Sequence, residues 1–176
     1  MSFIHHLVQN AYVVNDIDTA IERWHALWGI GPFFVRRHIE MPYVRYRGAL
    51  STIDMSAVYV QAGPIQVELV QQHCNAPSAF RDMYAAGQEG LHHVAVIPDD
   101  YDRLLAHYAA LGYPVAGEVR TAGGRGAAFV DTRPMLGHMM EVYMPGEGIP
   151  ALYRRVAEAA AAWDRRQLTI DLDPAK

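Results

Sequence analysis

Four polar residues occupy matching places in two halves of this chain, and their chemical types suit a divalent metal ion. Glu68 and Glu141 each lie near the middle of a short apolar run. A glutamate is rarely buried alone, so a carboxylate inside an apolar strand requires a cation nearby. Gln9 precedes the first of these runs in the sequence, and His93 precedes the second. One imidazole, one amide and two carboxylates form a possible ligand set for Zn, Ni, Co, Mn or Mg.

The four residues belong to an internal repeat that covers most of the chain. One register, with an offset of 84 residues, aligns Gln9 with His93, Asp16 with Asp100, and Trp24 with Tyr108. A constant offset predicts two copies of one structural unit. The two glutamates are 73 residues apart instead. The first copy therefore holds about 11 extra residues between its helix and its last strand.

Hydrophobic periodicity predicts that each copy begins with a strand and a helix and continues with three strands. In the first copy we expect these elements at residues 4–14, 17–28, 33–39, 44–60 with an interruption, and 64–71. In the second copy we expect them at 92–97, 100–111, 114–119, 126–131 and 137–143. Asp16 or its neighbour Asn15 can cap the first helix, and Gly29 ends it. A short connecting helix over 78–86 and a final helix over 150–166 complete the expected elements.

Composition is that of a globular protein. The chain has 176 residues, of which 51% are hydrophobic, and a formal net charge of −4. This charge predicts no general attraction to nucleic acid or to an anionic membrane. No apolar run approaches the ~20 residues that cross a bilayer, and we expect a cytoplasmic protein. The single cysteine, Cys74, excludes an intramolecular disulfide and a cysteine-based zinc site.

Residues 13–24, residues 90–96 and the two glutamate-bearing runs resemble the vicinal oxygen chelate superfamily, which includes the glyoxalase I and methylmalonyl-CoA epimerase families. The likeness covers residues 4–145. It implies an α+β fold in which two tandem βαβββ modules form a cupped mixed sheet around a central cavity. The modules would span residues 1–75 and 91–146, with a connecting helix and loop over 76–90 and a C-terminal helix and tail over 147–176.

The same resemblance implies one divalent metal ion, held by residues from the first and last strand of each module. These positions fall on Gln9, Glu68, His93 and Glu141. His5 shares strand parity with Gln9 and stays open as an alternative ligand. His92 is adjacent to His93, but on a regular strand it would point to the opposite face.

The activity that the resemblance implies is that of a metal-dependent isomerase, epimerase or lyase, moving a proton next to a carbonyl of a small substrate. Glu68 and Glu141 are the two candidate general bases. A non-catalytic small-molecule binding or resistance protein of the same fold is the alternative. A ring-cleaving dioxygenase is disfavoured, because it requires two histidines and one carboxylate. Relatives often assemble as dimers, so we expect a homodimer.

Basic residues near the extra segment are candidates for substrate binding. Arg36, Arg45 and Arg47 lie in or next to that segment, and Arg125 lies in a glycine-rich stretch of the second copy. Guanidinium groups bind the phosphates or carboxylates of a carrier such as coenzyme A or glutathione. Ordinary surface positions are the alternative for each of them.

Overall fold

One mixed sheet forms the body of the protein in the computed structural model, which describes residues 6–172. Across the described residues the strand order is β11-β2-β5-β6-β1-β7-β10-β9-β8-β3-β4. The strands are β1 (Leu7–Val13), β2 (Phe33–Arg36), β3 (Tyr43–Tyr46), β4 (Ala49–Leu50), β5 (Met55–Ala62), β6 (Ile65–Gln72), β7 (Gly90–Val96), β8 (Val115–Arg120), β9 (Gly126–Val130), β10 (Met139–Tyr143) and β11 (Thr169–Asp171). The helices are α1 (Ile17–Trp28), α2 (Tyr101–Ala110), α3 (Arg133–Leu136) and α4 (Gly148–Ala161).

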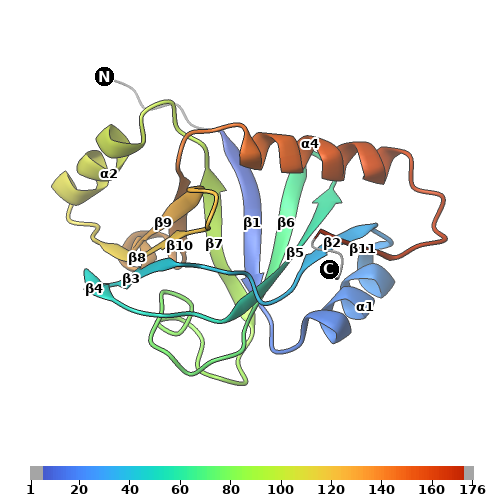
Figure 1. Ribbon diagram of the computed structural model, residues 1–176, viewed down its shortest axis with the longest axis horizontal. Coiled ribbons are helices and arrows are strands. Elements are labelled where there is room, and N and C mark those ends of the chain that lie inside the picture. Colours follow the sequence, from blue (N-terminus) through green and yellow to red (C-terminus); the bar gives the residue numbers. More distant parts are fainter. Residues whose placement is uncertain (1–5, 173–176) are drawn as a thin grey trace.

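The sequence repeat appears as a repeated strand order. The first copy contributes β2-β5-β6-β1, and the second contributes β8-β9-β10-β7. The first strand of each copy is parallel to the last, and the two first strands meet in antiparallel orientation at the centre of the sheet. The predicted α+β fold of two βαβββ modules with a C-terminal helix is confirmed. The sheet curves without closing (Figure 1).

Alternating side chains divide the sheet into two apolar faces. Ile17, Ala20 and Ile21 of α1 pack on one face, over strands of the first copy. Leu104 of α2 packs on the same face, over strands of the second copy. Val156 of α4 packs on the opposite face. Figure 1 shows α4 lying along one side of the curved sheet, with α1 and α2 near its two ends. The long C-terminal helix therefore covers the concave face.

The two repeated helices begin as the sequence predicts. Asp16 accepts a hydrogen bond from the Thr19 amide at 2.7 Å, and Asp100 accepts one from the Arg103 amide at 3.0 Å. Each carboxylate satisfies an amide that the first turn of its helix leaves unpaired. Gly29 ends α1 in the left-handed region, with φ of 65°.

The extra residues of the first copy extend the sheet of the second. β3 pairs in antiparallel orientation with β8, which is the outer strand of the second copy, and β4 pairs with β3. At the other end, the C-terminal strand β11 pairs with β2. Both additions satisfy backbone groups of edge strands that would otherwise be open.

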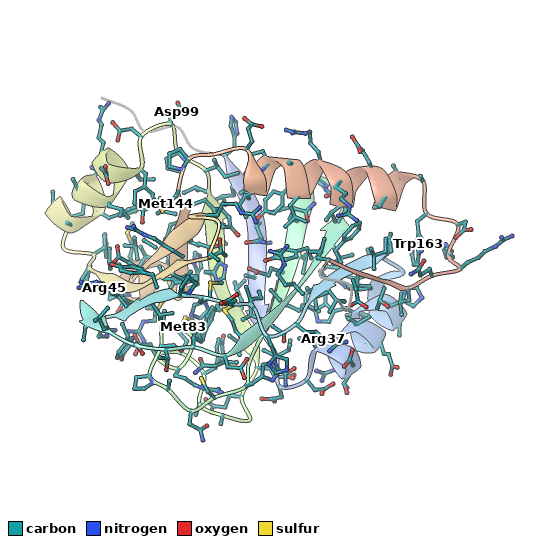
Figure 2. All side chains as sticks on the ribbon, viewed as in Figure 1. Arg37, Arg45, Met83, Asp99, Met144 and Trp163 are labelled. Atoms are coloured by element: carbon teal, nitrogen blue, oxygen red, sulfur yellow. The ribbon has the colours of Figure 1, made fainter. Side chains whose placement is uncertain are left out.

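Several elements differ from the predictions. Residues 78–86 form turns and no helix. The backbone hydrogen bonds there run from Asp82 to Ser78, from Met83 to Phe80 and from Tyr84 to Phe80, so no two successive amides donate to the fourth residue before them. The short helix α3 and strand β11 were not expected from the sequence. The final helix begins earlier and ends at Ala161, so Trp163 lies beyond it (Figure 2). The Trp163 indole packs closely over Gly31, which has no side chain to obstruct it. No helix in residues 6–172 is long and apolar enough to span a membrane.

Candidate metal and active site

Three of the predicted ligands meet on the concave face of the sheet. Glu68 lies on β6, His93 on β7 and Glu141 on β10, and all three side chains are buried. The Nε2 atom of His93 is 3.5 Å from Oε2 of Glu68 and 3.1 Å from Oε2 of Glu141. One ligand atom from each residue lies within 4.8 Å of the other two. Residues from both copies therefore form one cluster.

The register of the four central strands explains this meeting. Ala11 on β1 pairs with Glu68 on one side and with His93 on the other. Ala95 on β7 likewise pairs with Glu141 on one side and with Gln9 on the other. Directly paired residues share a face of the sheet. The two alanines have small side chains, which leaves room between the longer polar ones.

A β-bulge at His92 brings a second imidazole next to His93. Ala11 stands opposite His93 and Tyr12 stands opposite Leu91, so His92 is an extra residue in the pairing of β7 with β1. The Nδ1 atoms of the two histidines are 2.8 Å apart. The prediction that His92 points away from His93 is wrong, because the bulge interrupts the alternation of side chains.

Hydrogen bonds through His92 fix which ring nitrogen of His93 is free. His92 Nε2 lies 2.9 Å from the Ala79 carbonyl, which can only accept, so this nitrogen carries the hydrogen. Burial, followed by the charge of His93, holds the pKa of His92 well below its ordinary value. The neutral ring then accepts from Nδ1–H of His93. The Nε2 atom of His93 is left to face the two carboxylates.

The buried charges alter the protonation of the cluster. Burial alone disfavours the charged His93 ring, but the Glu141 and Glu68 carboxylates outweigh it and raise the pKa of His93 to about 9. Burial also raises the pKa of Glu68, and contact with His93 only partly offsets it. In the absence of a metal ion, His93 is therefore protonated at neutral pH, and its positive charge offsets the negative charge of the neighbouring carboxylates.

Gln9 is fully buried on β1, one strand away from His93. Its Oε1 atom accepts a hydrogen bond of 3.0 Å from the Tyr143 hydroxyl, and its Nε2 atom has no hydrogen-bond partner among residues 6–172. Gln9 does not line the cavity described below. Its role as a fourth ligand stays a prediction. The alternative, His5, lies outside the described residues.

A cavity of about 320 Å³ opens above the cluster, between the concave face and α4. Its lining includes all three clustered residues and the phenol of Tyr59, which pairs directly with Glu68 across β5 and β6. Leu152 of α4 and Phe129 of β9 contribute apolar walls. The volume suits a small organic molecule whose polar end contacts the cluster.

Arginines divide into two groups with respect to this cavity. Arg36 and Arg125 line it, as does Arg155 of α4, whose guanidinium lies 5.3 Å from the centre of the Phe34 ring. Arg45 instead donates to the Gly48 carbonyl at 2.6 Å and lies toward the β3–β4 end of the molecule (Figure 2).

Arg47 pairs with two carboxylates that lie outside the cavity lining. Its Nη2 atom is 2.6 Å from Asp82 and 3.0 Å from Asp131. These contacts raise the pKa of Arg47, and Arg133 together with Arg47 lowers the pKa of Asp131 to about 2. Of the three arginines that line the cavity in the described part of the chain, Arg155 is the one that the sequence did not predict. Its spacing of three residues from Leu152 on the final helix was the available signal.

The donor atoms of the cluster fit a divalent cation. His93 Nε2 and Glu141 Oε2 are buried and make no hydrogen bond of acceptable geometry within the part of the chain that the structure describes, although they lie at ion-pair distance from each other. A buried polar atom without a partner costs about 1–3 kcal/mol, and a cation would satisfy both. One imidazole nitrogen and two carboxylates match the preferences of Zn, Ni, Co or Mn, with Mg at the harder end.

The paired modules, the central cluster and the covered cavity define a vicinal oxygen chelate type of fold. The family model of the glyoxalase/bleomycin resistance protein/dioxygenase superfamily matches residues 8–129. The chain belongs to this superfamily, which confirms the resemblance seen in the sequence. None of the curated protein sequences compared with this chain matches it.

Solved structures share the fold at low sequence identity. A hypothetical protein from Bacillus halodurans C-125 has a TM-score of 0.55 and 16% identity, covering 81% of this chain and 96% of its own. A methylmalonyl-CoA epimerase in complex with methylmalonyl-CoA and NH4+ has a TM-score of 0.53 and 18% identity, covering 80% and 94%. A Streptomyces coelicolor methylmalonyl-CoA epimerase variant, in complex with 2-nitronate-propionyl-CoA, has a TM-score of 0.52 and 18% identity, covering 78% and 92%. At these identities the likeness concerns the fold alone.

Proposed function

We propose that this protein is a metal-dependent isomerase, epimerase or lyase that moves a proton at the carbon next to a carbonyl group. The observation that carries this proposal is the buried cluster of Glu68, His93 and Glu141 at the base of the cavity. These residues would hold the ion, with Gln9 as the candidate fourth ligand. When bound, a divalent ion polarises a carbonyl oxygen and lowers the barrier to removing the adjacent proton.

The two glutamates have the roles of general base and acid in this proposal. Glu68 and Glu141 lie on strands that correspond in the two copies, on either side of His93. A substrate in the cavity would have one carboxylate near each side of its reacting carbon. One glutamate removes the proton, and the same or the opposite glutamate returns it. His93 stays a ligand, because its Nδ1–H is held by His92.

The substrate that we propose is a small carbonyl compound with an anionic group. Arg36, Arg125 and Arg155 line the cavity from β2, from the turn before β9 and from α4. Guanidinium groups favour carboxylates and phosphates. Apolar walls from Met55, Phe129 and others fit a short hydrocarbon part. Acyl thioesters, the ligands named for the epimerase neighbours, and 2-oxo or 2-hydroxy acids therefore form the first panel to test.

Solvent deuterium exchange tests the proposal directly. The metal content of the purified protein is measured, the metal is removed with a chelator, and Zn, Ni, Co, Mn or Mg is added back. We expect exchange at the carbon next to the carbonyl in a substrate that binds, and a loss of 100-fold or more in Glu68→Gln or Glu141→Gln. Glu22→Gln on the exposed face of α1 is the matched control. If both active-site variants exchange the protons of a bound substrate as fast as the unmodified protein does, the assigned roles are wrong.

The binding-protein alternative differs from this proposal in one measurable respect. A binding protein would hold a ligand in the cavity without exchange of its protons, with or without metal. The dioxygenase alternative is not supported by the donor set, since the central cluster offers one histidine and two carboxylates. The cytoplasmic location and the homodimer stay predictions.

A further inference from the structure

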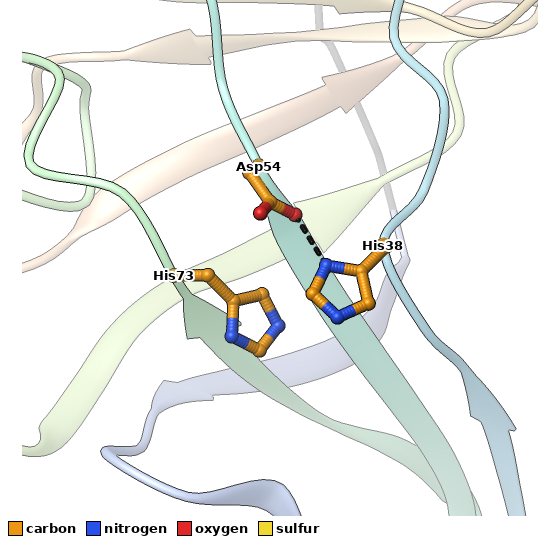
Figure 3. Close-up of side chains that lie close together, drawn as sticks. All are labelled: His38, Asp54 and His73. Carbon is orange, nitrogen blue, oxygen red and sulfur yellow. Dashed lines mark hydrogen bonds and ion pairs between the residues drawn. The ribbon is translucent and has the colours of Figure 1, made fainter.

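A second group of side chains with metal-binding chemistry lies at the ends of three strands, outside the cavity. His38 follows β2, Asp54 precedes β5, and His73 follows β6. Because β5 is antiparallel to both of its neighbours, these three strand ends meet. Figure 3 shows the two imidazoles and the carboxylate facing one another. One potential ligand atom from each residue lies within 4.8 Å of the other two.

The contacts within this group bring donor atoms together. The Nδ1 atom of His38 is 2.7 Å from Oδ1 of Asp54. The rings of His38 and His73 stack with centroids 4.4 Å apart and planes 27° apart. Imidazole and carboxylate together are ligands for Zn, Ni and Cu(II).

Backbone hydrogen bonds hold the three residues in place. The His38 amide donates to Ser56 Oγ at 3.1 Å, and the His73 amide donates to the Asp54 carbonyl at 2.8 Å. Ser56 Oγ also lies 2.7 Å from Nε2 of His73, so one buried hydroxyl connects both histidines. His38 has a φ of 45°, in the left-handed region that side chains seldom adopt. Such strained residues cluster at functional sites.

We infer that His38, Asp54 and His73 form a binding site for a divalent first-row transition metal ion, distinct from the central cluster. None of the three lines the cavity. The side chains of His38 and Asp54 are 65% and 47% exposed, so an ion can reach them from solvent and keep water in its remaining positions. Around Zn, ligand atoms lie roughly 3.3 Å apart, so these exposed side chains need only rotate slightly inward. The ion replaces the proton between His38 and Asp54.

A hydrolase-like pair of Ser56 and His73 explains the arrangement less well. Ser56 is 1% exposed, so its hydroxyl cannot reach a substrate in solvent. The Asp54 carboxylate contacts His38 rather than His73, so it does not orient the histidine that faces the serine. A metal site uses all three exposed side chains and leaves Ser56 as a support.

Isothermal titration calorimetry of the full chain with Zn²⁺ tests the inference. The metal-free Glu68→Gln/Glu141→Gln variant lacks two donors of the central cluster, and we expect it still to bind one Zn²⁺ per chain. Adding His38→Asn or His73→Gln to that variant should weaken this binding at least tenfold. Asparagine tolerates the left-handed conformation of position 38, so it removes the imidazole with little strain. His107→Asn on α2 should leave zinc binding unchanged.

A second arm avoids dependence on the folding of the glutamate variant. The His38→Asn/His73→Gln variant with an intact central cluster should bind one Zn²⁺ fewer per chain than the unmodified protein. Zinc should also raise the midpoint of thermal unfolding in the unmodified protein more than in this variant, because a bound ion stabilises the folded state. Equal stoichiometry in the two proteins would overturn the inference. Failure of the central site to bind metal would not produce that result, so the two proposals are tested separately.

Discussion

The Nδ1 atom of His92 lies 2.8 Å from the Nδ1 atom of His93, although the two residues are adjacent in a strand. The bulge at His92 makes this contact possible, and the Ala79 carbonyl fixes the hydrogen on the far nitrogen of His92. The His92 ring thereby decides that Nε2 of His93 faces Glu68 and Glu141. The support for the candidate metal site is thus built into the strand that carries its histidine.

Replacing His92 should weaken metal binding at the central cluster. His92→Phe preserves an aromatic ring against Phe80 but removes the acceptor for His93 Nδ1–H. Loss of such a supporting contact typically lowers metal affinity 10–100-fold. His92→Gln retains an acceptor oxygen and should recover part of the affinity. Zinc calorimetry in the His38→Asn/His73→Gln background measures this site alone. Unchanged zinc affinity in His92→Phe would show that the hydrogen bond from His93 to His92 does not support metal binding.

The metal-free protein should lose stability as the pH rises from about 6.5 to about 9. The folded-state pKa of His93 is raised to about 9 from an unfolded value near 6.5, so the folded protein binds more protons in this interval. The stabilisation is complete below pH 6.5 and is lost through pH 9, by at most about 3 kcal/mol. Urea unfolding of chelated protein at pH 6, 7.5 and 9 measures it. His93→Gln should flatten the trend; an equally steep trend in that variant would assign it to other groups.

Removing the guanidinium of Arg155 should weaken the binding of an anionic substrate. Arg155 lines the cavity, whereas its neighbour Arg154 does not line it and pairs with Glu147 at 3.7 Å. A hydrogen bond to a charged group contributes about 1.5–3 kcal/mol, so Arg155→Gln should raise KM roughly tenfold or more with a smaller effect on kcat. Arg154→Gln is the matched control. Steady-state kinetics should be measured on an acid and on its neutral ester. We expect KM to rise for the acid alone, whereas a change in the shape of the cavity would raise KM for both.

Truncating Val156 should loosen the helix that covers the cavity. Val156 is fully buried against the concave face. Val156→Ala removes two methyl groups from a packed site, and the free energy of unfolding should fall by about 2 kcal/mol. Ala151→Gly, on an exposed position of the same helix, should cost only about 1 kcal/mol through helix propensity. Denaturant unfolding compares the two. If Val156→Ala costs no more than Ala151→Gly, α4 is held by contacts other than those at Val156.

The sequence by itself determined the repeat and the elements that the repeat requires. Its constant offset, its helix caps at Asp16 and Asp100 and its two glutamates in apolar strands depend on local chemistry and on periodicity, which are visible without coordinates. These features predict the order of strands and helices in each copy, and the family resemblance that they support implies the α+β fold and the residues that meet at its centre. Guanidinium chemistry separately predicts four arginines as substrate-binding candidates, and two of them, Arg36 and Arg125, line the cavity.

Tertiary structure decided what no local pattern encodes. The bulge at His92 depends on how β7 pairs with β1, and the pairing of β3 with β8 depends on an edge in the other half of the chain. The meeting of His38 with Asp54 and His73 likewise needs three strand ends to lie side by side. Each of these contacts joins residues that are distant in sequence or shifts the alternation of a strand. Periodicity describes one element at a time, so it cannot specify where two elements are placed in register.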